Sequence, residues 1–412
     1  MIKSIKKLTK MLKLIFDATE LSYYNEYSGH RAGVFQVALN IFREFKSAGI
    51  DITFCCDYRR YFFLKEVLKK ENLFKDIQLI KEYSLINILW AKILYSTRKL
   101  PLLIRHSLII LARIYDKYFY IINKKNSIQL NEFNIYFSPF TPPSKEIQNA
   151  NLKRFRMIHD VIPLINQKKK TNPKDWHNKI YNTINKNDFY ITNSEYTKQD
   201  VLKYFPFIDN SHIKTTLLAA NRDFYPTEEK IIDENYIFSL CTLGKRKNLK
   251  FAMENFFTFI KKHNIEDLKL VLGGSVWKKY EKELNRIISK YDKSKIILTG
   301  YINDEDLKKY YSNALCFIYP SLYEGFGLPV LEAMQCGCPV ITSNKTSLPE
   351  VIGNAGIQIN QESNEELINA YERMYFDKDF RKNCINKGLE RAKLFSWEKC
   401  AKETIEFIKS TL

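Results

Sequence analysis

Short apolar runs alternate along this chain with segments in which apolar residues recur every three or four positions. The second pattern is clear in residues 34–46, where Val34, Val37, Ile41 and Phe45 fall on one face of a helix. Strand-like runs that are separated by helices predict parallel βαβ units. The strands predicted in the first half of the chain are 11–18, 52–57, 77–80, 134–140, 156–162 and 188–194.

A second series of the same kind begins near residue 235. The segment 205–234 between the two series contains two prolines and an acidic stretch, so we expect a domain boundary there. The predicted fold class is α/β, with two doubly wound, Rossmann-like domains whose facing sheets place a ligand site at the carboxyl ends of the strands. The later strands are 236–243, 268–275, 295–301, 315–321 and 339–344, and the helices between them are 247–263, 278–292, 304–313 and 328–336.

Residues 84–125 interrupt the alternation with one long helix or two shorter ones, in which aromatic, aliphatic and basic residues are interleaved. One interpretation is a helical pair that packs on the sheet. The other is an interfacial element whose Lys and Arg side chains reach toward lipid headgroups. Charged residues break every apolar run before it reaches about 20 residues, so we expect no transmembrane helix, and no signal peptide is expected.

The charge is unevenly distributed along the 412 residues. The chain holds 65 Lys and Arg against 46 Asp and Glu, a net charge of +19. Residues 1–200 carry 34 basic and 18 acidic residues, a net of +16, whereas residues 201–412 carry 31 and 28, a net of +3. A lysine-rich codon bias is the simple interpretation, although it should raise both halves. A basic first half indicates contact with an anionic membrane, a nucleic acid or a phosphorylated acceptor.

The eight cysteines are scattered, and none forms a CxxC pair or lies at metal-ligand spacing from a histidine. A reduced, cytosolic compartment fits this pattern. We expect no metal site and no disulfide framework.

The segment 319–344 carries the strongest chemical signal. A strand ends in a loop with Glu324, Gly325 and Gly327, and a helix follows. The glycines let backbone amides approach a ligand, and a helix N-terminus favours a phosphate. Glu324 and, further into the helix, Glu332 are suited to accept hydrogen bonds from sugar and ribose hydroxyls. The alternative is an ordinary βα loop with a solvated glutamate.

The stretch from Glu324 to Glu332 resembles the E-x7-E motif of the retaining glycosyltransferases of family 4, and residues 300–334 and 337–356 are similar to that family almost throughout. The resemblance implies the GT-B fold, with the acceptor domain first and the nucleotide-sugar domain second. The implied units are residues 1–215, residues 216–394 and a last helix, 395–412, which crosses back to the first domain with Trp397 as its anchor.

The resemblance also implies roles for single residues. Glu324 would contact hydroxyls of the donor sugar and Glu332 the ribose. The implied donor contacts are Gly33, Gly300, Tyr301, Gly325, Phe326, Gly327, Leu328 and Glu332, with the nucleobase read near Gly300 and Tyr301.

Arg246 and Lys247, in the stretch 241–249, stand where the family has a basic pair. A leaving diphosphate gains negative charge, and fixed cations would stabilise it. The alternative is a basic loop at a helix N-terminus, where cations are disfavoured unless an anion binds. Cys241 replaces the usual glycine, which leaves the local backbone in question.

The stretch 156–164 resembles the family's H-D motif. His159 would contact the donor sugar or line the acceptor site, and Asp160 is an acceptor-side candidate. In the following similar stretch, 192–201, Ser194 is favoured over Asn193 as a helix cap, with lining of the cleft as a further role.

The first βα turn, 28–41, has glycines before a helix but is not a GxGxxG motif. It resembles the family's first loop, which approaches the donor diphosphate and the acceptor, and Arg31 is a candidate contact there. A plain capping loop is the alternative.

The predicted reaction transfers a sugar from a nucleoside-diphosphate sugar to an acceptor hydroxyl with retention of configuration, and His159, Glu324, Arg246 and Lys247 are its catalytic candidates. We identify no clear carboxylate nucleophile, so departure and attack on one face are favoured. No cofactor or metal is expected, because Asp304 and Asp306 are interpreted as helix caps instead of a DxD pair.

The expected acceptor is a glycan or a lipid-linked saccharide of a bacterial surface polysaccharide. We expect a cytoplasmic protein, peripheral on the inner face of the membrane, with residues 1–13 and 84–125 toward an anionic bilayer. The rival interpretations are a GT-B relative such as an epimerase or phosphorylase, an inactive scaffold of that fold, and a nucleic-acid-binding protein, for which no module signature is present.

Overall fold

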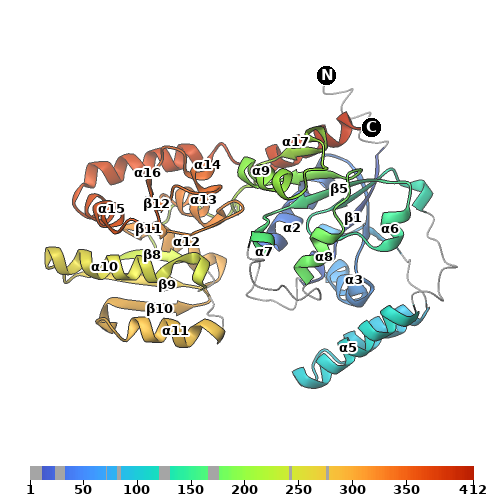
Figure 1. Ribbon diagram of the computed structural model, residues 1–412, viewed down its shortest axis with the longest axis horizontal. Coiled ribbons are helices and arrows are strands. Elements are labelled where there is room, and N and C mark those ends of the chain that lie inside the picture. The colour runs from blue at the N-terminus through green and yellow to red at the C-terminus, as the bar shows by residue number, and fades with distance from the viewer. Residues whose placement is uncertain are drawn as a thin grey trace.

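The chain folds into two α/β domains that lie side by side (Figure 1). The computed structural model describes residues 12–23, 33–70, 72–80, 85–119, 130–165, 176–240, 244–274 and 278–412. Each domain has one parallel sheet with helices on both faces. The predicted fold class is confirmed, and the arrangement of two Rossmann-like domains is that of the GT-B fold.

The sheet of the first domain has the strand order β3-β2-β1-β4-β5-β6-β7 among the described residues. All its pairings are parallel, and the order reverses between β1 and β4, where such sheets bind ligands. The strands are β1 (Lys13–Asp17), β2 (Asp51–Cys55), β3 (Gln78–Leu79), β4 (Ile135–Ser138), β5 (Lys153–Ile158), β6 (Phe189–Thr192) and β7 (Ile213–Thr215).

Aromatic side chains fill the space between this sheet and its helices. Phe42 lies with its ring centroid 4.9 Å from that of Phe54, and Phe45 lies 5.0 Å from Phe137. The helices are α2 (Gly33–Ser47), α3 (Tyr61–Lys70), α4 (Leu85–Ser96), α5 (Leu102–Phe119), α6 (Lys145–Asn149), α7 (Ile162–Ile165), α8 (Trp176–Asn182) and α9 (Glu195–Tyr204).

The sheet of the second domain has the order β10-β9-β8-β11-β12-β13 and is also parallel. Its strands are β8 (Asn235–Leu240), β9 (Leu268–Gly273), β10 (Ile296–Gly300), β11 (Cys316–Tyr319), β12 (Val340–Ser343) and β13 (Ile357–Ile359). Its helices are α10 (Leu249–His263), α11 (Lys278–Ile288), α12 (Asp304–Ser312), α13 (Leu328–Gln335), α14 (Leu348–Ile352), α15 (Asn364–Phe376) and α16 (Lys378–Ala392).

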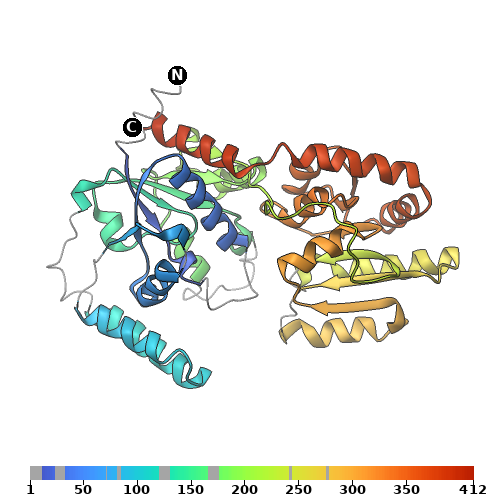
Figure 2. The same ribbon diagram turned by 180° about the vertical axis from the view of Figure 1, so that it is seen from behind.

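The last helix, α17 (Trp397–Ser410), runs from the second domain back onto the first (Figure 2). The indole Nε1 of buried Trp397 donates a hydrogen bond of 3.1 Å to the carbonyl oxygen of Ala220. Further along, the ring of Phe407 lies edge-on to Phe155 and Phe189. The helix therefore ties the two domains together outside the covalent linker.

Residues 85–119 form two helices instead of one, and they project from the first domain on the side away from α17. Inner α4 packs on α3, where the ring of Tyr95 lies 5.1 Å from that of Phe63 and its hydroxyl donates to Glu66. No helix in the described part of the chain, α4 and α5 included, is long and apolar enough to cross a membrane.

Candidate active site

A cavity of about 600 Å³ lies between the domains, at the carboxyl ends of strands from both sheets. Gly300 ends β10 and does not line it, and Arg31 lies outside the described residues. The predicted site residues that the cavity brings together are Gly33, His159, Asp160, Arg246, Lys247, Tyr301, Glu324, Gly325, Phe326, Gly327, Leu328 and Glu332.

Glu324 lies at the centre of the cavity wall between two cations. Its Oε1 is 2.8 Å from Nη1 of Arg246 and 2.6 Å from Nζ of Lys247. Burial alone would raise the pKa of this carboxyl, but Lys247 and Arg246 outweigh it and lower the pKa to about 2. Glu324 is therefore a permanent carboxylate, and the group of three carries one net positive charge toward a ligand.

Glu332, one turn into α13, has a different environment. Its Oε2 accepts a hydrogen bond of 3.1 Å from the hydroxyl of Tyr311. Burial raises the pKa of Glu332 to about 7, and the nearby charge of Asp304 acts in the same direction. The two motif glutamates thus differ in charge near neutral pH, since only Glu324 is fully ionised there.

His159 follows β5 and faces the cavity from the first domain. Its Nε2 lies 2.7 Å from the carbonyl oxygen of Pro139, and burial lowers the pKa of the ring. Because a carbonyl only accepts, the neutral ring carries its proton on Nε2 and keeps Nδ1 as an acceptor for a ligand hydroxyl. Burial raises the pKa of neighbouring Asp160, whose Oδ1 accepts from the amide of Ile162.

The loop before α13 requires glycine at two positions. A Cβ at Gly325 would lie 1.9 Å from the carbonyl oxygen of His159, so the close approach of the two domains excludes any side chain there. Gly327 caps α13 with a φ of 113°, a left-handed conformation that favours glycine. The first turns of α2 and α13 both line the cavity, with Gly33 of α2 against Leu328 of α13. Two helix N-termini there suit an anion.

Hydrogen bonds between the domains hold this loop in place. The hydroxyls of Ser194 and Thr197 both donate to the carbonyl oxygen of Gly325, at 2.7 and 3.0 Å. In return, the carboxylate of Glu350 accepts from the backbone amides of Glu195 and Tyr196 at the start of α9. We call Ser194, Thr197, Gly325 and Glu350, with the amides that Glu350 binds, the interdomain clasp.

The structure corrects one prediction and adds residues that sequence reasoning missed. Asn303, not Asp304 or Asp306, caps α12, because its side chain accepts from the amide of Asp306 at 2.9 Å. Asp304 instead lines the cavity beside Asn221. The Oδ2 of Asp304 accepts a hydrogen bond of 3.3 Å from Nδ2 of Asn221. Asn221 and Asp304 do not belong to a recognised motif, and only the folding of the chain brings Asn221 to the cavity wall.

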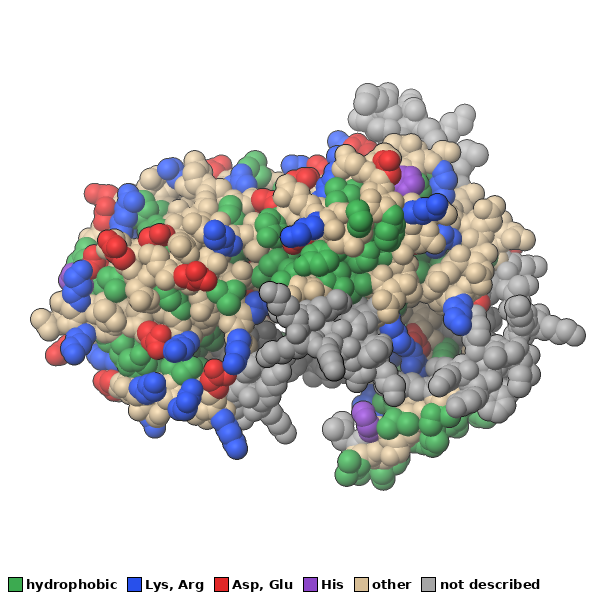
Figure 3. Space-filling model, viewed as in Figure 1, with side chains coloured by type: hydrophobic (Ala, Val, Ile, Leu, Met, Phe, Trp, Pro, Cys, Tyr) green, Lys and Arg blue, Asp and Glu red, His purple; other side chains and the backbone are tan. Residues whose placement is uncertain are grey.

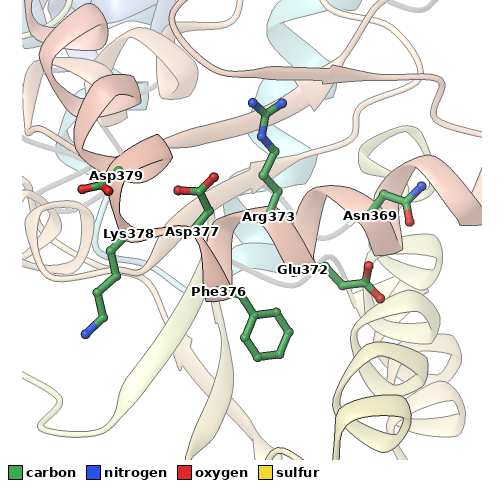
Figure 4. Close-up of a pocket in the computed structure, with 7 residues that line it drawn as sticks. All are labelled: Asn369, Glu372, Arg373, Phe376, Asp377, Lys378 and Asp379. Carbon is green, nitrogen blue, oxygen red and sulfur yellow. The ribbon is translucent and has the colours of Figure 1, made fainter.

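A second hollow, on the outer side of α15 and α16, is not a comparable site. Figure 4 shows its side chains pointing to different sides of the helices instead of converging. Glu372 is already bound by Lys262 and His263, and Asp377 caps α16. Among the described residues, no group of His, Cys, Asp or Glu could hold a metal ion.

Comparison with known proteins finds similarity to glycosyltransferases. Residues 221–391, which lie mostly in the second domain, match the family described as glycosyl transferases group 1. The chain is 30% identical over 241 residues to O-antigen chain mannosyltransferase B of Escherichia coli, and 28% identical over 274 residues to the serotype-specific mannosyltransferase WbdA of the same organism.

These relatives align over only part of their length. The first alignment covers 56% of this chain and 62% of the relative, and the second covers 63% and 33%. Among solved structures, sucrose-phosphate synthase from Thermosynechococcus elongatus superposes with a TM-score of 0.67 at 17% identity, covering 97% of this chain and 99% of that one. HepE from Anabaena, in complex with UDP and glucose, gives 0.67 at 13%, covering 97% and 100%. These two share the fold.

Proposed function

We propose that this protein is a retaining glycosyltransferase of family 4, which moves a sugar from a nucleoside diphosphate to an acceptor hydroxyl. The observation that carries the proposal is the group of Arg246, Lys247 and Glu324 beside the first turn of α13. Two cations and a helix N-terminus suit a diphosphate, and the carboxylate suits the hydroxyls of the attached sugar.

The proposed reaction takes place on one face of the sugar. The bond between the anomeric carbon and the diphosphate oxygen breaks, and the acceptor oxygen bonds to that carbon from the same side. The acceptor proton passes to the departing diphosphate, whose charge Arg246 and Lys247 stabilise. With a pKa of about 2, Glu324 is too weak a base to carry that proton, so it orients the sugar. His159 offers Nδ1 to a hydroxyl.

We propose a mannosyl donor and a growing surface polysaccharide, or its lipid-linked precursor, as acceptor. The support is the naming of similar proteins as O-antigen mannosyltransferases. The nucleoside would lie toward Tyr301 and Glu332, and the acceptor toward Asp160. The reaction needs no metal in this scheme, so activity should survive excess EDTA.

Release of nucleoside diphosphate from a panel of UDP- and GDP-sugars, with a mannosylated glycan acceptor, tests the proposal. Lys247→Ala should lower kcat/KM by about 100-fold or more, the usual effect of losing one group that stabilises transition-state charge. Lys245→Ala is the matched control, because Lys245 is two residues away and its side chain is 72% exposed, and it should stay within about twofold of wild type.

Two results would overturn the proposal. One is the absence of turnover with every nucleotide sugar in the panel. The other is an equal effect of the Lys247 and Lys245 substitutions, which would mean that the buried cation does not act on the leaving group.

We also propose that α4 and α5 dock on an anionic bilayer, which would place the enzyme on the inner face of the cytoplasmic membrane. Large apolar side chains of α5 face solvent, visible as the green surface at the lower edge of Figure 3. Leu103 is 84% exposed, and Ile110, Leu111 and Ile114 continue the same face at helical spacing.

The positive charge of residues 85–119 favours an anionic bilayer as the partner that covers the apolar face of α5. Residues 85–119 contain six Lys and Arg and one acidic residue, so a second copy of the chain would bring like charges together. Each basic residue near an anionic surface contributes about 1 kcal/mol of attraction. Residues 1–11 and 120–125, which the sequence also assigned to the membrane, lie outside the described part of the chain.

A further inference from the structure

The side chain of Asn193 is buried in the cavity wall, and within the described part of the chain its oxygen has no hydrogen-bond partner. Asn193 directly follows β6 and is 4% exposed, and no described residue forms a hydrogen bond with its Oδ1. It lines the same cavity as His159 and Gly325. An unsatisfied buried amide costs about 1–3 kcal/mol, so a fold that keeps one invites a functional explanation.

A structural role for this amide is already filled by its neighbour. The hydroxyl of Ser194 accepts from the amide of Thr197 at 3.0 Å and so caps α9, while it also donates to the carbonyl of Gly325. The interdomain clasp therefore forms without any contribution from the side chain of Asn193. What remains for Asn193 is a partner inside the cavity.

The position of Asn193 indicates which part of a ligand would meet it. Its chain neighbour Ser194 binds Gly325, which directly follows Glu324, so Asn193 borders the region where the transferred sugar would lie. The nucleoside is proposed to lie elsewhere, toward Tyr301 and Glu332. A sugar hydroxyl both donates and accepts, and it can therefore pair with either end of an amide.

We propose that the amide of Asn193 hydrogen-bonds a hydroxyl of the transferred sugar and thereby selects which sugar the enzyme accepts. This inference rests on the proposed glycosyl transfer. A site that is built to pair with a hydroxyl rejects analogues that lack it, because the buried polar group is then left unpaired. Asn193 is thus a specificity-determining residue next to the group of Arg246, Lys247 and Glu324.

The inference is tested by measuring kcat/KM of the wild type and of Asn193→Ala with the full donor and with a series of deoxy-sugar donors. In the wild type, the donor that lacks the paired hydroxyl should lose about 10- to 100-fold in kcat/KM. Asn193→Ala should lose a similar factor with the full donor but show no further loss with that one analogue. The other deoxy donors should lose equally in both proteins.

Thermal unfolding provides the readout that a merely structural amide would move. Asn193→Ala should unfold at the same temperature as wild type or higher, because it removes a buried group without a partner. Ser194→Ala should unfold at a lower temperature, since it loses a helix cap and a clasp contact.

Each contrary outcome has a distinct meaning. If every deoxy donor loses the same factor in wild type and in Asn193→Ala, and Asn193→Ala unfolds at a lower temperature than wild type, the amide is structural. That result would overturn this inference but leave the proposed function standing. If Asn193→Ala raises the KM for the acceptor and leaves donor selectivity unchanged, the inference is also overturned, because the amide then binds a hydroxyl of the acceptor. A wild type that turns over no nucleotide sugar would overturn the proposed function, and this inference with it.

Discussion

Glu324 and Glu332 share one motif but are held in opposite electrostatic states. Two cations keep Glu324 ionised, whereas burial beside Tyr311 leaves Glu332 with a pKa of about 7. Glu324 can therefore bind sugar hydroxyls at any physiological pH. In the proposed role, Glu332 would accept a hydrogen bond from a ribose hydroxyl best once it has lost its proton, which would make donor binding sensitive to pH near neutrality.

Donor affinity should consequently rise with pH. At pH 6 about a tenth of a carboxyl with a pKa of 7 is ionised, and at pH 8 about nine tenths, so binding through the carboxylate strengthens by up to about tenfold. Titration calorimetry with the nucleoside diphosphate would measure this. Glu332→Gln should flatten the profile, and a wild-type affinity that does not change between pH 6 and 8 would contradict the assigned role.

The same shift has a stability consequence of opposite sign. The folded-state pKa of Glu332 lies above the unfolded value of 4.5, so the folded state holds a proton that the unfolded state has lost between about pH 4.5 and 7. The free energy of unfolding therefore falls as pH rises through that window. Asp17 and Glu20, whose pKa values burial raises to about 6 and about 7, act in the same direction.

Single residues could be predicted from the sequence where a motif fixes both type and spacing. Glu324, Arg246 and Lys247 are of this kind, and the structure places a charged atom of each cation within 2.8 Å of Oε1 of Glu324. The sequence names Asn193 only as a second choice for a helix cap and does not single out Glu350, because their roles depend on residues that are distant in the chain. No local pattern reports that a buried amide lacks a partner or that a carboxylate meets a helix of the other domain.

Among the elements, α9 joins the domains at the site through hydrogen bonds. Its N-terminus is capped twice, by Ser194 of its own chain segment and by Glu350 of α14 in the second domain. A carboxylate at a helix N-terminus is favoured by the exposed amides and by the helix dipole. The clasp therefore couples the position of the loop before α13 to the start of α9.

Removing that carboxylate should loosen the clasp. Glu350→Ala is expected to cost about 1 kcal/mol, the typical value of a helix cap, and to speed hydrogen exchange at the amides of Glu195 and Tyr196. Glu365→Ala, at an exposed position in the first turn of α15, is the matched control and should leave exchange at α9 unchanged. Unaltered exchange in Glu350→Ala would show that the contact does not hold the domains.

Element types followed from periodicity, whereas two short strands at sheet edges were not predicted. The strands β7 and β13 span three residues each, too few for a run of apolar residues to stand out. The sequence assigned the cap of α12 to Asp304 and Asp306, whereas the observed hydrogen bond shows that Asn303 is the cap. Periodicity could not distinguish one long helix from two in residues 84–125, where Pro101 lies between α4 and α5.

At the scale of the whole molecule, the basic surplus and the exposed apolar face belong to the same domain. The first 200 residues carry a net of +16, and α5 in that domain presents Leu103 and Leu111 to solvent. The proposed nucleotide site in the other domain has two placed cations, Arg246 and Lys247, instead of a broad basic surface. Charge and apolar surface together favour docking of the first domain on a membrane.

Co-sedimentation with vesicles should show this docking. The wild type is expected to bind vesicles that contain phosphatidylglycerol more strongly than neutral phosphatidylcholine vesicles, and to be released as salt screens the attraction. Leu103→Glu combined with Leu111→Glu should weaken binding by at least about tenfold. Leu394→Glu, at a position 54% exposed on the second domain, should have no effect.

Two outcomes would count against membrane docking. Equal binding to anionic and neutral vesicles would mean that the basic surplus reflects a lysine-rich codon bias and not membrane binding. A dimer in solution that the double substitution dissolves would show that a second copy covers the face of α5.

The anomeric configuration of the product tests the central claim most directly. The full-length protein would be incubated with an α-linked nucleoside-diphosphate mannose and a glycan acceptor, and the new linkage followed by nuclear magnetic resonance. Front-face transfer in the cavity of Arg246, Lys247 and Glu324 predicts an α-linked product that Lys247→Ala forms far more slowly. A β-linked product, or none with any nucleotide sugar, would contradict the account.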